Sequence, residues 1–248
     1  MLTKRLTVIV IHYNRPTLLR RALDSVEAQT CRSQIDVIVC DDHSDEVPWD
    51  ALSGYTVIRG PRLTPEEKQR DRCTLGWLIN RALALVETEF VAYLTDDCQW
   101  TPDHLERLVA MLDADPGAVA ACSRWRLVGD PAANRGREPS PYPRARMDSF
   151  EIDLLLQGRN LIDHNVLMHR TAHHGERIVP AWPEEPRYWP HADWPAWRSL
   201  AARTDPAALW LFDHAITVNL YNDATHLGAS ALRGESVAQS IRNRPDTP

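Results

Sequence analysis

Short, nearly unbroken apolar runs alternate with helical patterns through the first half of the chain. Four such runs occupy residues 6–13, 35–40, 90–95 and 118–128, and a weaker one occupies residues 55–60. Runs this short, rich in β-branched residues and without polar alternation, are typical of strands buried on both faces. We therefore predict five strands, most of them in one parallel sheet.

Helices are predicted between these strands. Residues 17–29 carry apolar side chains at helical spacing after a turn at Asn14, and residues 65–87 show one long helical pattern. A further helix is expected over 101–116, with Thr101 as its N-cap. This alternation predicts an α/β fold with a doubly wound, mostly parallel sheet flanked by helices. Such sheets bind ligands at the carboxyl ends of their strands.

The second half of the chain has a different texture. Residues 129–147 are rich in proline and arginine and predict a long loop, and the segment 177–192 carries no readable pattern. The tail at 241–248 is expected to be disordered. We expect a single domain over residues 1–240.

Composition excludes several classes of partner. A net charge of -6 provides no general attraction to nucleic acid or anionic lipid. We find no apolar window near the ~18 residues of a membrane span, and the N-terminal apolar run is too short for a signal peptide. The 5 cysteines are odd in number and include no CxxC pair, which favours reduced thiols and a cytoplasmic protein.

Polar clusters follow three of the predicted strands, with the sequences HYNR, DDHSD and TDD. The last contains the adjacent acids Asp96 and Asp97. Adjacent carboxylates repel each other, but Mg²⁺ or Mn²⁺ bound by them would neutralise the pair and could bridge to a diphosphate. The alternative is a solvated acidic turn before a helix. The position of the pair after a buried strand favours the metal.

The quoted clusters belong to longer stretches that resemble, in order, the inverting family 2 glycosyltransferases. The resemblance covers roughly residues 6–230, in the stretches TVIVIHYNRPTLLRRALDSVEAQT, IDVIVCDDHSDE, INRALALVETEFVAYLTDDCQWTPDHLERLV, NLIDHNVLMHR, HADWPAWRSLAAR and NLYNDATHLGAS. In its IDH and TDD wording the chain is most similar to the spore-coat polysaccharide members of that family.

The resemblance implies a GT-A fold, that is, the Rossmann-like nucleotide-diphospho-sugar transferase fold. The implied donor is a UDP- or dTDP-sugar, and the implied cofactor is Mn²⁺ or Mg²⁺. The implied acceptor is a hydroxyl of a small glycoside, a natural product or a polysaccharide precursor. Residues 1–128 would form the nucleotide-sugar half and residues 129–240 the acceptor half.

The resemblance also implies a set of nucleotide-binding residues, namely His12, Tyr13, Asn14, Arg15, Asp41, Arg72 and Asp96. Asp41 would accept the imide N–H of a pyrimidine base, unless it only caps an acidic loop. Arg72 would reach the base or a phosphate, with Arg70 as the alternative.

The implied metal ligands are Asp97 and His226. Cys98 stands where a full DxD motif would have its third acid, so the diphosphate and water would complete the coordination. For His226 the alternative is a solvated loop histidine, because imidazole suits softer metals better.

Asp193 occupies the family's position for the general base. Inverting transfer needs a carboxylate that takes the proton of the attacking hydroxyl. The alternative for Asp193 is a helix N-cap, and the two roles are compatible. Further pocket residues implied for the donor and acceptor are Asp163, His164, Trp189 and Trp194. Core packing is the alternative for each tryptophan.

Two other functions, and a zinc site, are alternatives to glycosyl transfer. A sugar-nucleotide nucleotidyltransferase would carry a Gly-rich phosphate loop after the first strand, where this chain has HYNRPTLL. A catalytically silent nucleotide-sugar-binding protein would not need the three acids Asp96, Asp97 and Asp193. His169 and His173 have zinc-site spacing on a helix, but no third ligand follows at helical spacing.

Overall fold

A computed structural model describes most of the chain, namely residues 4–129, 146–147, 162–188, 192–204 and 209–222. The predicted tail at 241–248 and most of the predicted loop at 129–147 lie outside the described residues.

Four strands of the first half form one continuous parallel block of the sheet, as predicted. They are β1 (Leu6–His12), β2 (Ile35–Asp41), β3 (Thr56–Arg59) and β4 (Phe90–Thr95), and they pair in the order β3–β2–β1–β4. Almost every side chain of β1, β2 and β4 is buried. This burial explains why their sequences are apolar without alternation.

The sheet continues beyond β4 with strands from both halves of the chain. The order β4–β8–β6–β11–β5 joins β8 (Leu167–Arg170), β6 (Ala118–Gly129), β11 (Leu209–Asn222) and β5 (Cys98–Trp100). A ninth strand, β7 (Arg146–Met147), pairs with β11. The prediction of β6 is confirmed, whereas β5, β8 and β11 were not predicted. Because β6 pairs with both β8 and β11, the described parts of both halves build one sheet.

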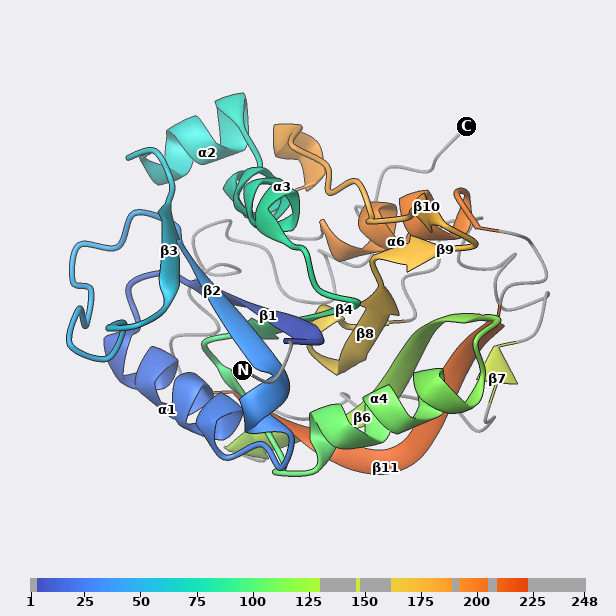
Figure 1. The fold of residues 1–248 in the computed structure, drawn as a ribbon. Coiled ribbons are helices and arrows are strands. Elements are labelled where there is room, and N and C mark those ends of the chain that lie inside the picture. The colour runs from blue at the N-terminus through green and yellow to red at the C-terminus, as the bar shows by residue number, and fades with distance from the viewer. Residues whose placement is uncertain (1–3, 130–145, 148–161, 189–191, 205–208, 223–248) are drawn as a thin grey trace.

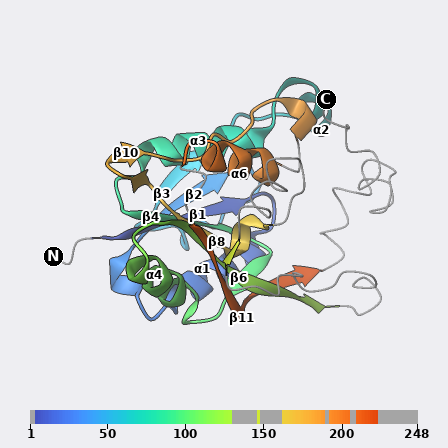
Figure 2. The same ribbon diagram turned by 90° about the vertical axis from the view of Figure 1, so that its right-hand side faces the viewer.

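Helices cover both faces of this sheet (Figures 1 and 2). On one face lie α1 (Pro16–Glu27) and α4 (His104–Ala114), and on the other lie α2 (Pro65–Asp71), α3 (Thr74–Leu85) and α6 (Asp193–Ala201). Each of the longer helices turns an apolar stripe inward. Among the helices that the structure describes, none combines the length and the apolar character needed to cross a bilayer.

Short elements complete the description. They are the 3-10 helices η1 (Arg32–Gln34), η2 (His164–Val166) and η3 (Pro186–Tyr188) and the antiparallel pair β9 (Ala172–His173) and β10 (Glu176–Arg177). The five cysteines are all buried and unpaired, in agreement with the expected reduced thiols.

The prediction of a single helix over 65–87 is wrong, because two non-helical residues separate α2 from α3. Arg72 is extended, with φ -163° and ψ 137°, and the amide of Cys73 donates to the carbonyl of Glu184 at 2.8 Å. In the next turn, Gly76 lies so close to Pro183 that a Cβ would stand 1.9 Å from its carbonyl oxygen. A contact distant in sequence therefore interrupts a locally helical pattern.

The predicted start of α4 at Thr101 is also wrong. The helix begins at His104, and no side-chain hydrogen bond caps it. Thr101 instead extends the sheet region, because its amide donates to the carbonyl of Thr217 at 2.8 Å. Its hydroxyl donates to Asp103 at 2.7 Å.

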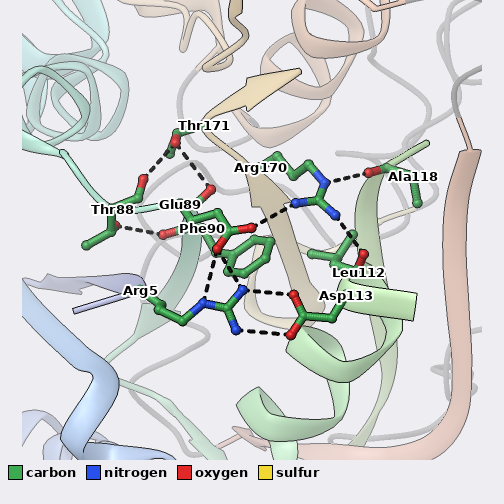
Figure 3. A network of polar contacts seen from close by, with 9 residues as sticks. All are labelled: Arg5, Thr88, Glu89, Phe90, Leu112, Asp113, Ala118, Arg170 and Thr171. Atoms are coloured by element: carbon green, nitrogen blue, oxygen red, sulfur yellow. Dashed lines mark hydrogen bonds and ion pairs between the residues drawn. The ribbon is translucent and has the colours of Figure 1, made fainter. Parts of the chain in front are cut away.

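An ionic network ties together the amino ends of the parallel strands (Figure 3). The Arg5 guanidinium donates to Glu89 and Asp113, and the Arg170 guanidinium donates to Glu89 and to the Leu112 and Ala118 carbonyls. Both guanidinium groups also lie over the Phe90 ring, at 5.3 Å and 5.2 Å. This network anchors β1, β4, β8 and α4 at the edge opposite the predicted site.

Candidate active site

The three polar clusters meet at the carboxyl ends of β1, β2 and β4, as the fold predicts. His12 is in register with Asp41, and Ile11 is in register with Thr95. The backbone continues this pairing past the strand ends, since the Asp42 amide donates to His12 and the Asp96 amide donates to Ile11.

Asp96 is fully buried and contacts three groups from the β1 end. Its Oδ2 accepts from His12 Nδ1 at 3.0 Å and from the Tyr13 amide at 3.2 Å, and its Oδ1 pairs with Arg15. Burial raises the pKa of the Asp96 carboxyl above its ordinary value, although the bond from His12 and the charge of Arg15 act in the opposite direction. Asp96 therefore orients the segment 12–15.

Asp97 shares Arg15 with Asp96. The Arg15 Nη1 atom lies 3.2 Å from Asp97 Oδ2, and the Thr95 hydroxyl donates to Asp97 Oδ1 at 2.6 Å. Asp97 is only 4% exposed. The repulsion expected between two adjacent carboxylates is thus offset by one bridging guanidinium.

Asn165 connects the acid pair to the second half of the chain and was missed from the sequence. Its side-chain oxygen accepts from the Thr95 amide at 2.7 Å. Asp163 in turn accepts from both the amide and the side-chain nitrogen of Asn165 at 2.8 Å. Asp163 therefore caps η2 and, through Asn165, holds the end of β4.

The missing third acid has a structural reason. Cys98 is the first residue of β5, is 1% exposed, and pairs with Leu220 of β11. A carboxylate at this position would lose its hydration, which is costly without a partner.

Asn14 links the loops after β1 and β2. Its backbone is left-handed, with φ 51°, a conformation that asparagine tolerates. Its amide donates to the Ser44 hydroxyl at 2.8 Å, and its side-chain oxygen accepts from the Asp45 amide at 2.7 Å.

The two adjacent acids at the end of β2, Asp41 and Asp42, have different surroundings. Asp41 is fully buried, and its carboxylate accepts from the Ser44 amide and from Arg59 Nε. Asp42 Oδ2 accepts from Lys68 at 2.6 Å and from the Thr74 hydroxyl at 2.9 Å, whereas its Oδ1 is buried with no hydrogen-bond partner in the described structure. Burial raises the pKa of the Asp42 carboxyl.

Lys68 is a further cation at this edge, where it pairs with Asp42, and no sequence pattern predicts it. Its Nζ lies 3.9 Å from the centre of the Tyr13 ring, and Tyr13 is 41% exposed. Of the two arginines considered, Arg70 forms an ion pair with Asp71, and Arg72 lies 5.5 Å from the Trp77 ring centre.

Asp193 is the first residue of α6 and not its N-cap, so the N-cap role considered for it is wrong. The N-cap is Ala192, and the helix has no side-chain cap. Asp193 Oδ1 accepts from the Trp194 amide at 2.9 Å, and Oδ2 lies 3.9 Å from His164 Nδ1. Burial lowers the pKa of His164, but the charges of Asp193, Asp163 and Asp97 raise it, and the net shift is upward.

Aromatic side chains pack behind Asp193. Trp182 and Trp197 are buried and lie 5.3 Å apart between ring centres, each also contacting Tyr93. Trp194 is half-buried, with the Arg198 guanidinium 5.0 Å from its ring. Trp194 thus differs from the two core tryptophans, while Trp189 lies outside the described residues.

The described residues contain no group of three or more potential metal-binding side chains. His226 lies outside them. His169 and His173 lie on β8 and β9 rather than on a helix, and His169 bonds to the hydroxyl of Tyr93 at 2.7 Å. The metal site at Asp97 therefore stays a prediction.

Comparison with known families identifies the class of protein. Residues 7–174 match the model of glycosyl transferase family 2, and the chain belongs to this family. The predicted enzyme class, a glycosyltransferase, is confirmed by that membership.

Two curated relatives illustrate the range of similarity. Protein CgeD of Bacillus subtilis is 27% identical over 79% of this chain and 46% of its own length. The succinoglycan biosynthesis protein ExoW of Rhizobium meliloti is 39% identical over 41% of this chain and 32% of its own length. The chain thus spans less than half the length of these relatives. The narrower resemblance to spore-coat transferases stays a prediction.

Solved structures confirm the GT-A fold. TarS of S. aureus, in complex with UDP-GlcNAc, superposes with a TM-score of 0.64 at 16% identity, over 88% of this chain and 59% of that chain. The mannosyltransferase PcManGT of Pyrobaculum calidifontis, in complex with GDP-Man and Mn²⁺, gives 0.58 at 16% identity, over 99% and 66%.

Proposed function

We propose that this chain transfers a sugar from a nucleoside diphosphate sugar to an acceptor hydroxyl with inversion at the anomeric carbon. The observation that carries the proposal is the pairing of Asp96 and Asp97 with Arg15 at the sheet edge. The negative charge of Asp97 also acts on His164, which lies beside Asp193. The relatives with sugar-nucleotide ligands support this kind of donor.

The nucleobase end of the site would be formed by Tyr13, Asp42 and Lys68. The buried Oδ1 of Asp42 could accept a hydrogen bond from an N–H of the base, and the Lys68 ammonium could donate to a carbonyl oxygen of the base. The exposed ring of Tyr13 could stack on the base. This set suits the imide of uracil or thymine. Asp41 would support the loop instead, because Arg59 and Ser44 already occupy its carboxylate.

The residues fit a divalent cation that the substrate helps to bind. Asp97 would be the main protein ligand, with His226 as the further candidate, since Mg²⁺ and Mn²⁺ sites combine one or two carboxylates with phosphate oxygens and water. The cation would neutralise charge on the departing diphosphate. Asp96 would keep its structural partners and approach the ribose.

Asp193 would act as the general base. The acceptor oxygen forms a bond to the anomeric carbon while the bond from that carbon to the diphosphate oxygen breaks. The hydroxyl proton passes to Asp193, and the bonding electrons leave with the diphosphate. Asp163, Trp194 and Trp189 would line the sugar and acceptor side, and the acceptor class stays a prediction.

A thermal-shift panel of UDP-, dTDP- and GDP-sugars, each with and without Mn²⁺, tests the proposal. A ligand at 100 times its Kd stabilises the folded state by about 2.7 kcal/mol, so the true donor class should raise Tm clearly. We expect a pyrimidine nucleotide sugar to give the largest rise, and Mn²⁺ to increase it. No shift with any nucleotide sugar would contradict the proposed donor site.

A further inference from the structure

His164 is held in an unusual polar environment. Both ring nitrogens are buried, and neither has a hydrogen-bond partner within the described part of the chain. The ring meets Trp182 edge-on, at 6.1 Å between centres and an angle of 83°. Burying a polar ring without partners is unfavourable, so the arrangement calls for a compensating interaction.

The compensating group is the carboxylate of Asp193. His164 Nδ1 lies 3.9 Å from Asp193 Oδ2, which is within ion-pair range but longer than a hydrogen bond. A hydrogen bond requires the two groups to approach by less than about 1 Å, since Nδ1 and Oδ2 now lie 3.9 Å apart. The other oxygen, Oδ1, already accepts from the Trp194 amide at 2.9 Å. Each carboxylate oxygen has two lone pairs, so an incoming hydroxyl can still bond to the group.

The charges around His164 favour a donor at this position. Carboxylates face it from three elements: Asp163 in its own segment, Asp193 on α6 and Asp97 after β4. Trp182 adds an aromatic face without charge. Among the carboxylates that the structure describes around the ring, Asp193 is the one within ion-pair distance of His164 Nδ1.

We propose that His164 is a positioning residue that donates from Nδ1 to Oδ2 of Asp193 and so fixes the direction of that carboxylate. Its catalytic relevance rests on the proposed function, in which Asp193 is the base. The pairing itself does not. A misdirected base loses rate because proton transfer needs the donor and acceptor at hydrogen-bond distance.

NMR titration of the histidine rings tests the pairing without any assay of transfer. The His164 resonances are assigned by their absence from His164→Gln. In Asp193→Asn we expect the His164 pKa to fall by about 1 pH unit or more, because an opposite charge at this range is removed. The exposed ring of His214 on β11 serves as the internal control. An unchanged His164 titration overturns the proposal.

Kinetics of two variants test the positioning role. In His164→Asn the amide nitrogen can replace Nδ1, whereas His164→Leu removes the donor at similar bulk. We expect His164→Leu to lower kcat roughly 10- to 100-fold with little change in the donor KM. His164→Asn should recover part of this loss, and the acidic limb of the kcat–pH profile should move in His164→Leu.

The outcomes separate the two proposals. The positioning role is overturned if His164→Asn and His164→Leu lose the same factor in kcat. It is also overturned if His164→Leu raises the donor KM and leaves kcat unchanged. If Asp193→Asn retains full transfer while the His164 titration still shifts, the pairing stands and the base assignment fails. Circular dichroism and Tm identify a variant that misfolds, and the titration of His164 in Asp193→Asn then decides the pairing.

Discussion

The guanidinium of Arg15 bridges the acid pair, with Nη1 3.2 Å from Asp97 Oδ2 and Nη2 paired with Asp96. In the absence of a bound cation, Arg15 is therefore the counter-ion of both carboxylates. If Asp97 holds the proposed divalent ion, Arg15 and that ion would compete for the Asp97 carboxylate.

Replacing Arg15 should expose this competition. Arg15→Gln leaves two buried carboxylates without their shared cation, and we expect the free energy of unfolding to fall by about 1–3 kcal/mol. Mn²⁺ should then raise Tm by more in the variant than in the wild type. The measurement is thermal unfolding with and without Mn²⁺.

Arg20→Gln is the matched control for Arg15→Gln. Arg20 lies in α1, which follows Arg15, and forms an exposed pair with Asp50, so Arg20→Gln should leave the free energy of unfolding nearly unchanged. A response of Arg15→Gln to Mn²⁺ no larger than the wild-type response would show that Arg15 does not stand in for a cation.

The two acids at the end of β2, Asp41 and Asp42, should respond differently to substitution. Asp42→Asn should raise the Kd for UDP roughly 10- to 100-fold, since a hydrogen bond to a charged group contributes about 1.5–3 kcal/mol. Asp41→Asn should mainly lower the free energy of unfolding, because Asp41 holds Arg59 and the Ser44 amide. Calorimetric titration with UDP and urea unfolding separate the two effects. Equal losses of UDP affinity would refute this division.

Gly76→Ala should displace the segment that carries Trp182. The new Cβ would lie 1.9 Å from the Pro183 carbonyl oxygen and 2.8 Å from its carbon, both backbone atoms. Overpacking costs about 1–3 kcal/mol, which exceeds the ~1 kcal/mol that alanine gains in a helix. We expect a lower Tm and, because Trp182 contacts His164, a lower kcat.

Gly117→Ala provides the comparison for Gly76→Ala. Its Cβ would meet only the Asp115 carboxylate, at 3.4 Å. It should therefore change Tm little. A Gly76→Ala protein as stable as Gly117→Ala would show that the contact between α3 and the Pro183 segment can relax.

Acidic pH should destabilise the protein, because two buried histidines resist protonation in the folded state. Burial lowers the pKa of His104 to about 3 and that of His169 to about 4. In the unfolded chain these rings take up a proton near pH 6.5, so the unfolded state binds more protons below that pH. Stability should therefore fall as the pH drops from 6.5 toward 4, by up to about 1.4 kcal/mol per pH unit for each histidine.

Urea unfolding at several pH values measures this slope. His104→Gln should make it shallower, whereas His214→Gln, at an exposed position on β11, should not. A slope that is the same in all three proteins would contradict the assignment to buried histidines.

The parts of the fold that could be read from the sequence are those with local signals. The buried strands β1, β2 and β4 have continuous apolar runs, and their shared carboxyl edge brings HYNR and TDD together. By contrast, β11 was missed because its pairing with β6 is interrupted by register shifts around Phe212 and Ile216, which obscure a simple strand period.

The residues missed at the site depend on contacts between distant segments. Lys68 reaches Asp42 across 26 positions, and Asn165 reaches Thr95 across 70. Neither pair leaves a pattern within one element. The break between α2 and α3 has the same origin, since it depends on the Glu184 carbonyl.

The central claim is that Asp193 removes the proton of the acceptor hydroxyl. Asn at this position keeps the size of the side chain and its bond to the Trp194 amide but cannot accept that proton. The decisive measurement is sugar transfer by Asp193→Asn together with its affinity for the nucleoside diphosphate. We expect turnover to fall by about 10²- to 10⁴-fold or below detection, with Kd within a few-fold of wild type. Turnover close to the wild-type rate would contradict the account.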